Sequence, residues 1–303
     1  MDRWLRNSLV EATYKLRYTC QQHISHSGNY LMPTAAERQR HVTAKLERAR
    51  NHLHEFKQLH DTFLKSNPYK VGVKRDIETR KLIYHIASVE QPEDGMSTAV
   101  GDILKNLISA LDHLAYQLVC IGMGSDGPFY HEYFPIADSF SEYEAKKRRK
   151  VQGMTADAIK AIDEIKPYKG GNDLLWRLYK LNNIDKHRLL ITVGSAFRSV
   201  NVGALMHRMM QKTLEEKGVS LPTLDLYLRP ADRLFPLKAG DELFIDAPDA
   251  EVNDKMQFCF DVAFGETQIV EGEPLLETLN QLIGLVEQTV TKFEPLLNWG
   301  VKK

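Results

Sequence analysis

The stretch that most constrains the fold is residues 101–121, GDILKNLISALDHLAYQLVCI. Its apolar residues recur every three or four positions, as on one side of a helix with 3.6 residues per turn. This pattern predicts a core-facing helix whose buried stripe comprises Val100, Ile103, Leu104, Leu107, Leu111, Leu114 and Leu118. Asn106 and His113 lie on one flank of that stripe, and Asp112 precedes His113. A side chain on such a flank is half-buried and still reaches a ligand, so these three residues are candidate site residues.

The composition excludes several classes of protein. The 303 residues include 40 basic and 40 acidic ones, so no net charge draws the whole chain to nucleic acid or to a membrane. The three cysteines are widely spaced and form no CxxC pair, which predicts neither a disulfide framework nor a zinc site. No apolar run approaches the ~18 residues of a membrane span, and the N-terminus lacks the apolar segment of a signal peptide. No GxGxxG or P-loop occurs either, so we expect a cytoplasmic protein without a cofactor or a metal.

Residues 1–34 are expected to form an N-terminal arm and linker. Apolar residues such as Trp4 and Leu9 alternate there with basic ones, which predicts a short basic amphipathic helix before a linker at residues 22–33. Such a helix lies on a membrane surface or on a partner. The alternatives are a peripheral helix, or sequence upstream of a start at Met32.

From residue 35 onwards, the hydrophobic pattern alternates between helical and strand-like segments. A helix is expected over residues 35–65, and His60 in its apolar stripe is interpreted as a hydrogen-bonded core histidine. The segments YKVGV and KLIYHIASV predict a β-hairpin, and Ser97 is a candidate N-cap of the helix that follows. Further helices are expected over residues 155–165, 173–188 and 274–298, and strands in LLITVGSAF, LDLYLRP, ELFIDAP and MQFCFDVAF.

These elements predict an α+β fold with one composite domain over residues 35–303. Its helical core comprises residues 35–190 and 273–299, with the hairpin inserted after the first long helix. An antiparallel sheet region, residues 189–272, follows, and the long C-terminal helix closes it by returning to the core. Near the end of the 173–188 helix, Asp185 and Arg188 fall on the core-facing side, so they are expected to form a partly buried ion pair.

Four segments in this order, NLISALDHLAYQL, FPI, KPY and LNNIDKHRLL, resemble a family of uncharacterised bacterial proteins. The shared pattern of that family runs NLRSALDHL, FPI, QPY and IDKHR, and the resemblance covers about residues 45–195. The family is in turn similar to the HEPN superfamily of helical proteins, many of which are ribonucleases with an Arg-x4-6-His motif on a core helix. The resemblance therefore implies a HEPN-like helical bundle at the core of the α+β fold.

The motif histidine falls on His113, whereas the motif arginine falls on Ile108. In the ribonuclease mechanism that the resemblance implies, the histidine moves protons and the arginine stabilises charge on the phosphate, commonly across a dimer interface. Loss of that cation removes ~2–4 kcal/mol of transition-state stabilisation. Lys186 or Arg188 is the expected replacement. The candidate catalytic residues are therefore His113, Asp112, Asn106, Lys186 and Arg188.

A structural role is the alternative for the same residues. Aspartate and histidine on a core helix often hydrogen-bond neighbouring loops, such as the FPI backbone. Asp112 or His113 would then join Lys186 or Arg188 in a polar network that specifies the fold. A metal site that combines the ALDH and DKHR segments is disfavoured, because Asp112 and His113 are adjacent on a helix and point about 100° apart.

A run of five basic residues, KKRRK, is a second candidate site. Adjacent cations contact phosphates in nucleic-acid-binding proteins. The alternative is a solvated helix end. The candidate nucleic-acid-binding residues are Lys146, Lys147, Arg148, Arg149 and Lys150.

Together these features predict an RNA- or nucleotide-related HEPN-like protein with a degraded ribonuclease motif and a role in defence or stress response. RNA or a nucleotide is the expected partner, a homodimer is the expected assembly, and any ribonuclease activity would be metal-independent. The alternative function is that of a non-catalytic interaction or structural module, with a fold-specifying network made of Asp112, His113, Asp185 and Arg188.

Overall fold

The computed structural model describes most of residues 34–297. The residues that lie outside the description are 1–33, 127–128, 130–132, 188–192, 204–205, 207–209, 211–225, 230–233, 254–255, 267–268, 271 and 298–303. The chain divides into two units, residues 1–34 and Ala35–Lys303. The predicted amphipathic arm therefore lies outside the described residues.

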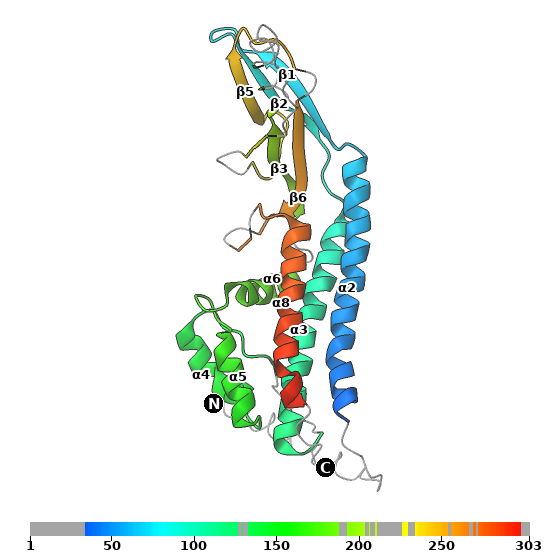
Figure 1. The fold of residues 1–303 in the computed structure, drawn as a ribbon, viewed down its shortest axis with the longest axis vertical. Helices are drawn as coiled ribbons and strands as arrows, with labels where there is room; N and C mark the ends of the chain where they lie inside the picture. Colours follow the sequence, from blue (N-terminus) through cyan, green and yellow to red (C-terminus); the bar gives the residue numbers. More distant parts are fainter. Residues whose placement is uncertain are drawn as a thin grey trace, which may run out of the picture. The chain divides into compact units, whose positions relative to one another are not determined.

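The second unit is a mixed α+β structure (Figure 1). Its described helices are α2 (Ala35–Lys65), α3 (Asp94–Met123), α4 (Phe140–Lys150), α5 (Ala156–Ile165), α6 (Asp173–His187) and α8 (Leu275–Leu297). Its described strands are β1 (Tyr69–Arg75), β2 (Lys81–Val89), β3 (Val193–Asn201), β4 (Tyr227–Leu228), β5 (Glu242–Pro248) and β6 (Gln257–Phe264). The hairpin, the long helices and the four later strands that the sequence predicts are all present.

The helical core is built around α3, whose apolar stripe is buried as predicted. All seven residues of the predicted stripe are at most 1% exposed. The long helices α2 and α8 pack along α3 (Figure 1) and contribute Phe56 and Phe293, which are fully buried. None of the described helices combines the length and the apolar character that crossing a bilayer requires.

The start of α3 differs from the prediction, and Ser97 is not its N-cap. The helix begins at Asp94, after Glu93, whose side chain makes no capping hydrogen bond. Ser97 lies within the helix and is 8% exposed. Met96 is 2% exposed and packs in the helical core. Burial of this apolar side chain favours the additional helical residues more than a capping bond from Ser97 would favour a later start.

Three shorter helices, α4, α5 and α6, accompany the three long ones (Figure 1), and polar side chains cap their first turns. Ser139 caps α4 and Thr155 caps α5, each by accepting a backbone N–H bond. Asn172, the residue before α6, accepts the N–H of Leu175 at its Oδ1 atom, at 3.1 Å. These caps satisfy donors that have no partner inside the helix.

The strands form two three-stranded sheets instead of one sheet region with a separate hairpin. One sheet has the order β1-β2-β5 and the other the order β4-β3-β6, and all described pairings are antiparallel. The predicted hairpin pairs with the later part of the chain, because β2 lies beside β5 with Ile83 opposite Ile245. Tyr69, Ile86 and Phe197 are buried in a second apolar core that belongs to the sheets.

Strand β6 belongs to both apolar cores. Phe258 and Phe260, near its start, pack in the sheet core. Val262 and Phe264, near its end, are fully buried in the helical core. The chain then returns to Pro274, which forms a β-bridge with β6 and precedes α8. Polar residues of β6 therefore lie at the junction between the sheets and the helices.

Candidate functional site

Asp112, on α3, contacts the loop that follows the helix. The backbone N–H of Phe134 donates to Asp112 Oδ1 at 3.0 Å, and Phe134 is 3% exposed in the helical core. This is the loop contact that the structural interpretation of the ALDH segment expects, and it holds the FPI segment against α3. Loss of the acceptor of a buried N–H lowers the free energy of unfolding by about 1–3 kcal/mol.

Two lysines from other helices act on the Asp112 carboxylate. Burial raises the pKa of Asp112 to about 6, and the Phe134 hydrogen bond and the charges of Lys186 and Lys150 oppose this rise. Burial lowers the pKa of Lys150, and the charge of Asp112 opposes that change in turn. Lys186 on α6 is exposed, whereas Lys150 at the end of α4 is partly buried. Asp112 thus links α3 electrostatically to α4 and α6.

His113 is exposed and faces α2. The partners of Asp112 lie on other elements. Partial burial of the ring and the charge of Lys45 lower the pKa of His113, while a hydrogen bond to the His41 backbone raises it. The net change is downward, so the imidazole is neutral at pH 7. The cation beside His113 is therefore Lys45, whereas the predicted replacement for the motif arginine, Lys186, acts on Asp112.

The remaining predicted catalytic residues have other partners or lie outside the description. Asn106 donates from Nδ2 to the backbone oxygen of Asp102, one turn earlier on α3, at 2.8 Å. Arg188, and with it the predicted ion pair to Asp185, lies outside the described residues. Ile108, at the position of the motif arginine, is 8% exposed and packs in the core. Among the described members of the predicted catalytic set, Asp112 and Lys186 therefore act on each other, whereas Asn106 and His113 have other partners.

Asp185, on α6, lies against α3 at Gly101. A Cβ atom built on Gly101 would come within 2.9 Å of Asp185 Cγ and closer still to Oδ1, nearer than real Cβ atoms approach other atoms. Burial and the charge of Asp102 raise the pKa of this carboxyl group. A side chain at position 101 would therefore displace the Asp185 carboxyl group from its place against α3.

Gly101→Ala is expected to lower the free energy of unfolding by about 1–3 kcal/mol, because Asp185 must move to admit the methyl group. Gly284→Ala in α8 is the matched control. No atom lies within 4 Å of a Cβ built at Gly284. Its higher helix propensity should therefore raise the free energy of unfolding, by up to ~1 kcal/mol. Urea denaturation checks both variants, and equal changes in the two would contradict the packing argument.

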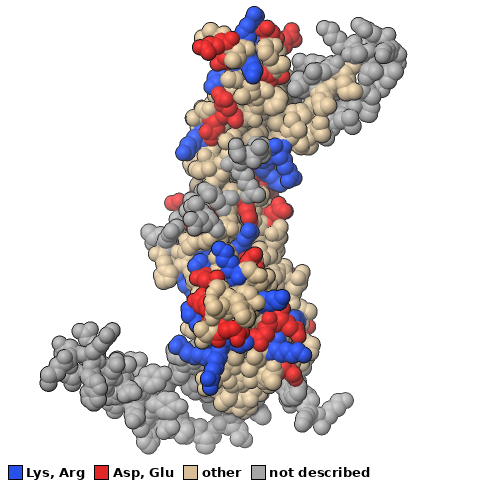
Figure 2. All heavy atoms as spheres, turned by 90° about the vertical axis from the view of Figure 1, so that its left-hand side faces the viewer, with Lys and Arg blue, Asp and Glu red and all other residues tan. Residues whose placement is uncertain are grey.

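The basic run 146–150 forms the end of α4, and acidic residues pair with part of it. Lys146 and Lys147 form ion pairs with carboxylates of α4 and α5. Lys150 is under the influence of Asp112, and Arg148 and Arg149 are exposed. Figure 2 shows acidic side chains between the basic ones on the face that it presents. The run therefore does not present five uncompensated cations to a phosphate backbone.

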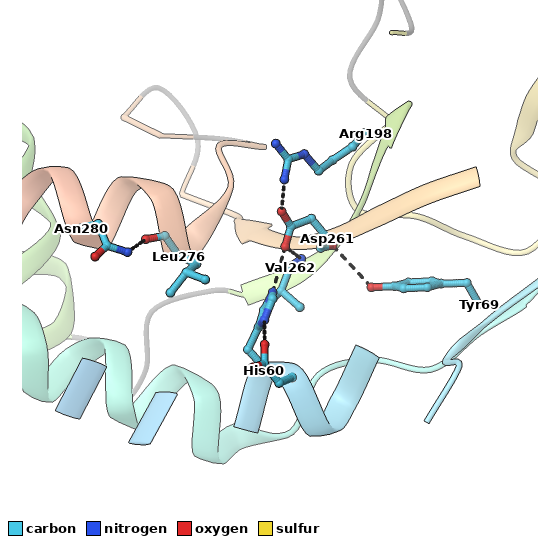
Figure 3. Close-up of polar contacts among 8 residues, drawn as sticks. His60, Tyr69, Arg198, Asp261, Val262, Leu276 and Asn280 are labelled. Carbon is cyan, nitrogen blue, oxygen red and sulfur yellow. Dashed lines mark hydrogen bonds and ion pairs between the residues drawn. The ribbon is translucent and has the colours of Figure 1, made fainter. Parts of the chain in front are cut away.

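A second polar cluster joins α2 to the sheets (Figure 3). His60 Nε2 lies 2.9 Å from Asp261 Oδ1, and His60 Nδ1 lies 3.2 Å from Asp61 Oδ1. Arg198 on β3 donates from Nη1 to Asp261 Oδ2 at 2.9 Å, and the N–H of Val262 donates to Asp261 Oδ1 at 2.8 Å. His60 and Asp261 are 6% and 7% exposed. The prediction of a hydrogen-bonded core histidine at position 60 is confirmed.

The cluster favours the charged form of His60. The hydrogen bond to Asp261 raises the pKa of His60 and outweighs the opposing effect of burial. Both ring nitrogens face carboxylates, and both are donors in the imidazolium form. Asp261 therefore pairs with two basic side chains, His60 and Arg198, and both ring nitrogens of His60 are occupied by carboxylates.

Two adjoining cavities lie beside this cluster, and we call them together the junction cleft. Their volumes are about 430 and 540 Å³, within the range of small-molecule sites. The residues that line both cavities are Arg198, Asp261, Pro274, Glu277 and Gln281. Strands β3 and β6 and the first turns of α8 thus supply the shared wall.

The sequence contains one signal for the junction cleft that the hydrophobic periodicity does not reveal. Asp261 is the one charged residue in the apolar strand MQFCFDVAF. A carboxylate in a buried strand needs cationic or hydrogen-bonding partners. The signal does not identify those partners, because His60 lies 201 positions earlier in the chain and Arg198 lies 63 positions earlier.

Comparisons with known proteins give no match for this chain. No family model, no curated protein and no solved structure matches it. Among the described residues, no group of three or more His, Cys, Asp or Glu side chains is placed to hold a metal ion.

Proposed function

We propose that the chain is a non-catalytic interaction or binding module in which the ALDH and DKHR segments specify the fold. The observation that carries this proposal is the separation of the partners of Asp112 and His113. Asp112 accepts the Phe134 N–H, and His113 bonds to the α2 backbone at His41. A general acid and base that act on one reacting group must both lie within hydrogen-bond reach of it, and these two side chains face different elements.

A HEPN-like helical core is part of the proposal. Its support is the resemblance of the four ordered segments, together with their proximity in space. The NLISALDHL segment lies on α3 and the FPI segment is bonded to it through Asp112. The KPY segment lies beside the FPI segment, because Tyr168 forms a β-bridge with Ala137, the residue after FPI. We infer that the resemblance reflects shared packing, with the polar residues retained as contacts between segments.

An RNA- or nucleotide-related function is the second candidate, and one observation favours it. His113 has a lowered pKa and lies in the field of Lys45. A neutral imidazole accepts protons, and a nearby lysine can stabilise a phosphate in place of the missing motif arginine. RNA would then bind the exposed seam between α2 and α3, with a second protomer completing the site in a cytoplasmic defence or stress response.

Incubation of the purified protein with mixed RNA in the presence of EDTA separates the two candidates. The proposal predicts that the wild-type protein and His113→Ala leave the RNA equally intact. His54→Ala is the matched control, because His54 is an exposed histidine on α2 that bonds only to Gln58 among the described residues. Cleavage that persists in His54→Ala and is lost in both His113→Ala and Lys45→Ala would contradict the proposal and support the second candidate.

A further inference from the structure

We propose that the junction cleft binds a small organic anion, with a carboxylate or phosphate group held by Arg198 and Arg229. This inference is independent of whether the ALDH segment is catalytic, because it concerns a different part of the molecule. It rests on the charged residues that line the cleft, on which of them are already paired, and on the apolar side chains beside them.

Arg198 is anchored and still has donors to offer. Its Nη1 atom donates to Asp261 Oδ2 at 2.9 Å, and its side chain is 47% exposed. Asp261 in turn is fixed by His60 and by the Val262 N–H (Figure 3). Arg198 lines both cavities, and Nη1 is the guanidinium atom for which a hydrogen bond is found among the described residues. A guanidinium group held along one edge is preorganised to bind a carboxylate or phosphate through its remaining donors.

Arg229, which follows β4, provides a second cation in the first cavity. It is exposed, and no carboxylate among the described residues pairs with it. Arg198 and Arg229 come from different segments and line the same cavity, so both can donate to one bound anion.

The acidic residues of the cleft are largely neutralised by other partners. Asp261 is paired with His60 and Arg198, and Glu273 is paired with Arg177 at 3.0 Å. Glu277 remains, and its place in the first turn of α8 lets the helix dipole stabilise its charge. Outside these pairs the described lining carries one arginine, Arg229, and one carboxylate, Glu277, so anion binding depends on the open donors of Arg198 and Arg229 and not on a net positive charge.

Apolar side chains line part of the cleft, more of the second cavity than of the first, where polar surface predominates. The first cavity is bordered by Ala196, Phe197 and Ala263, and the second by Leu64 and Phe260. Small-molecule sites combine a mostly apolar wall with a few polar groups that fix the orientation of the ligand. The ligand class is thus a compact molecule with one acidic group and an apolar body.

Isothermal titration calorimetry with three related probes tests this inference on the full chain. Benzoate and phenyl phosphate carry the two acidic groups on the same ring, and benzamide is the neutral counterpart. The wild-type protein is expected to bind benzoate or phenyl phosphate saturably at millimolar concentrations and to bind benzamide more weakly. Which of the two anions binds more tightly distinguishes a carboxylate ligand from a phosphate ligand.

Arg198→Gln is expected to weaken binding about tenfold or more, the usual effect of deleting a hydrogen bond to a charged group. Arg229→Gln is a second variant that leaves the His60–Asp261 cluster intact and should weaken binding in the same direction. Arg48→Gln is the control, since Arg48 is an exposed arginine of α2 outside the cleft. Absence of saturable binding of both anions, equal binding of benzamide, or wild-type affinity in both cleft variants would overturn the proposal.

Discussion

Asp261→Ala is expected to lower the free energy of unfolding by about 3–5 kcal/mol, the cost of removing one member of a buried ion pair. Asp261 is 7% exposed and accepts bonds from His60, from Arg198 and from the Val262 N–H. Its removal leaves a buried imidazole and a buried backbone donor without their acceptor. Denaturant unfolding monitored by circular dichroism measures the change.

Asp261→Asn separates the charge of this side chain from its hydrogen bonds. The amide oxygen can still accept one bond, so the loss should be smaller than for Asp261→Ala. Because the pKa of His60 is raised in the folded state, the charge-dependent stabilisation is fully present below the unfolded-state pKa of about 6.5 and is lost as the pH rises through the folded-state pKa. The stability difference between wild type and Asp261→Asn should therefore shrink with rising pH. A difference that grows with pH would contradict this role of His60.

Asp112→Ala is expected to lower the free energy of unfolding by about 1–3 kcal/mol at pH 4, where the carboxyl group is still protonated in the folded state, because the buried Phe134 N–H loses its acceptor. The contact with Phe134 is the direct link between α3 and the FPI segment. Asp112→Asn keeps an oxygen that can accept this N–H, so it should cost less than half as much. A loss as large as that of Asp112→Ala would contradict the claim that the bond to Phe134 is what Asp112 contributes.

The raised pKa of Asp112 sets the direction of its pH dependence. The carboxyl group keeps its proton to about pH 6 in the folded state but only to about pH 4 in the unfolded state. The folded state therefore binds more protons between these values, and the contribution of Asp112 to stability falls as the pH rises through this window. Because Asp112→Asn cannot titrate, the stability of wild type relative to this variant should decline from pH 4 to pH 6. A rise over that range would be inconsistent with the burial of this carboxyl group.

Local patterns in the sequence were sufficient to predict the helical core. The apolar stripe of α3 repeats with the helical period over five turns, and the same rule identified α2 and α8. On α6 the helical spacing of Leu174, Leu178 and Leu181 corresponds to burial at Leu178 and Leu181, which are fully buried, whereas Leu174 is partly buried. The N-cap prediction at Ser97 was wrong, because a capping residue is a local signal whereas the burial of Met96 is a tertiary effect.

Pairing between distant segments could not be predicted in the same way. Alternation identifies a strand but does not specify its neighbour, so nothing local indicated that β2 would pair with β5. The junction cleft depends on the same kind of information, since it brings residues of α2, β3, β6 and α8 together. At the ALDH segment, the residue types indicated a polar pair, but only the fold shows that Asp112 faces the FPI loop and His113 faces α2.

The most direct test of a structural role for the ALDH segment is the hydrogen exchange rate of the Phe134 amide, followed by NMR in wild type and Asp112→Ala. A structural role predicts slow exchange in the wild type, because Asp112 Oδ1 accepts this buried N–H. It also predicts faster exchange in the variant, with amides of the α8 core as the internal reference for global unfolding. A Phe134 amide that exchanges as slowly in Asp112→Ala as in wild type would contradict the claim that Asp112 holds the FPI segment in place.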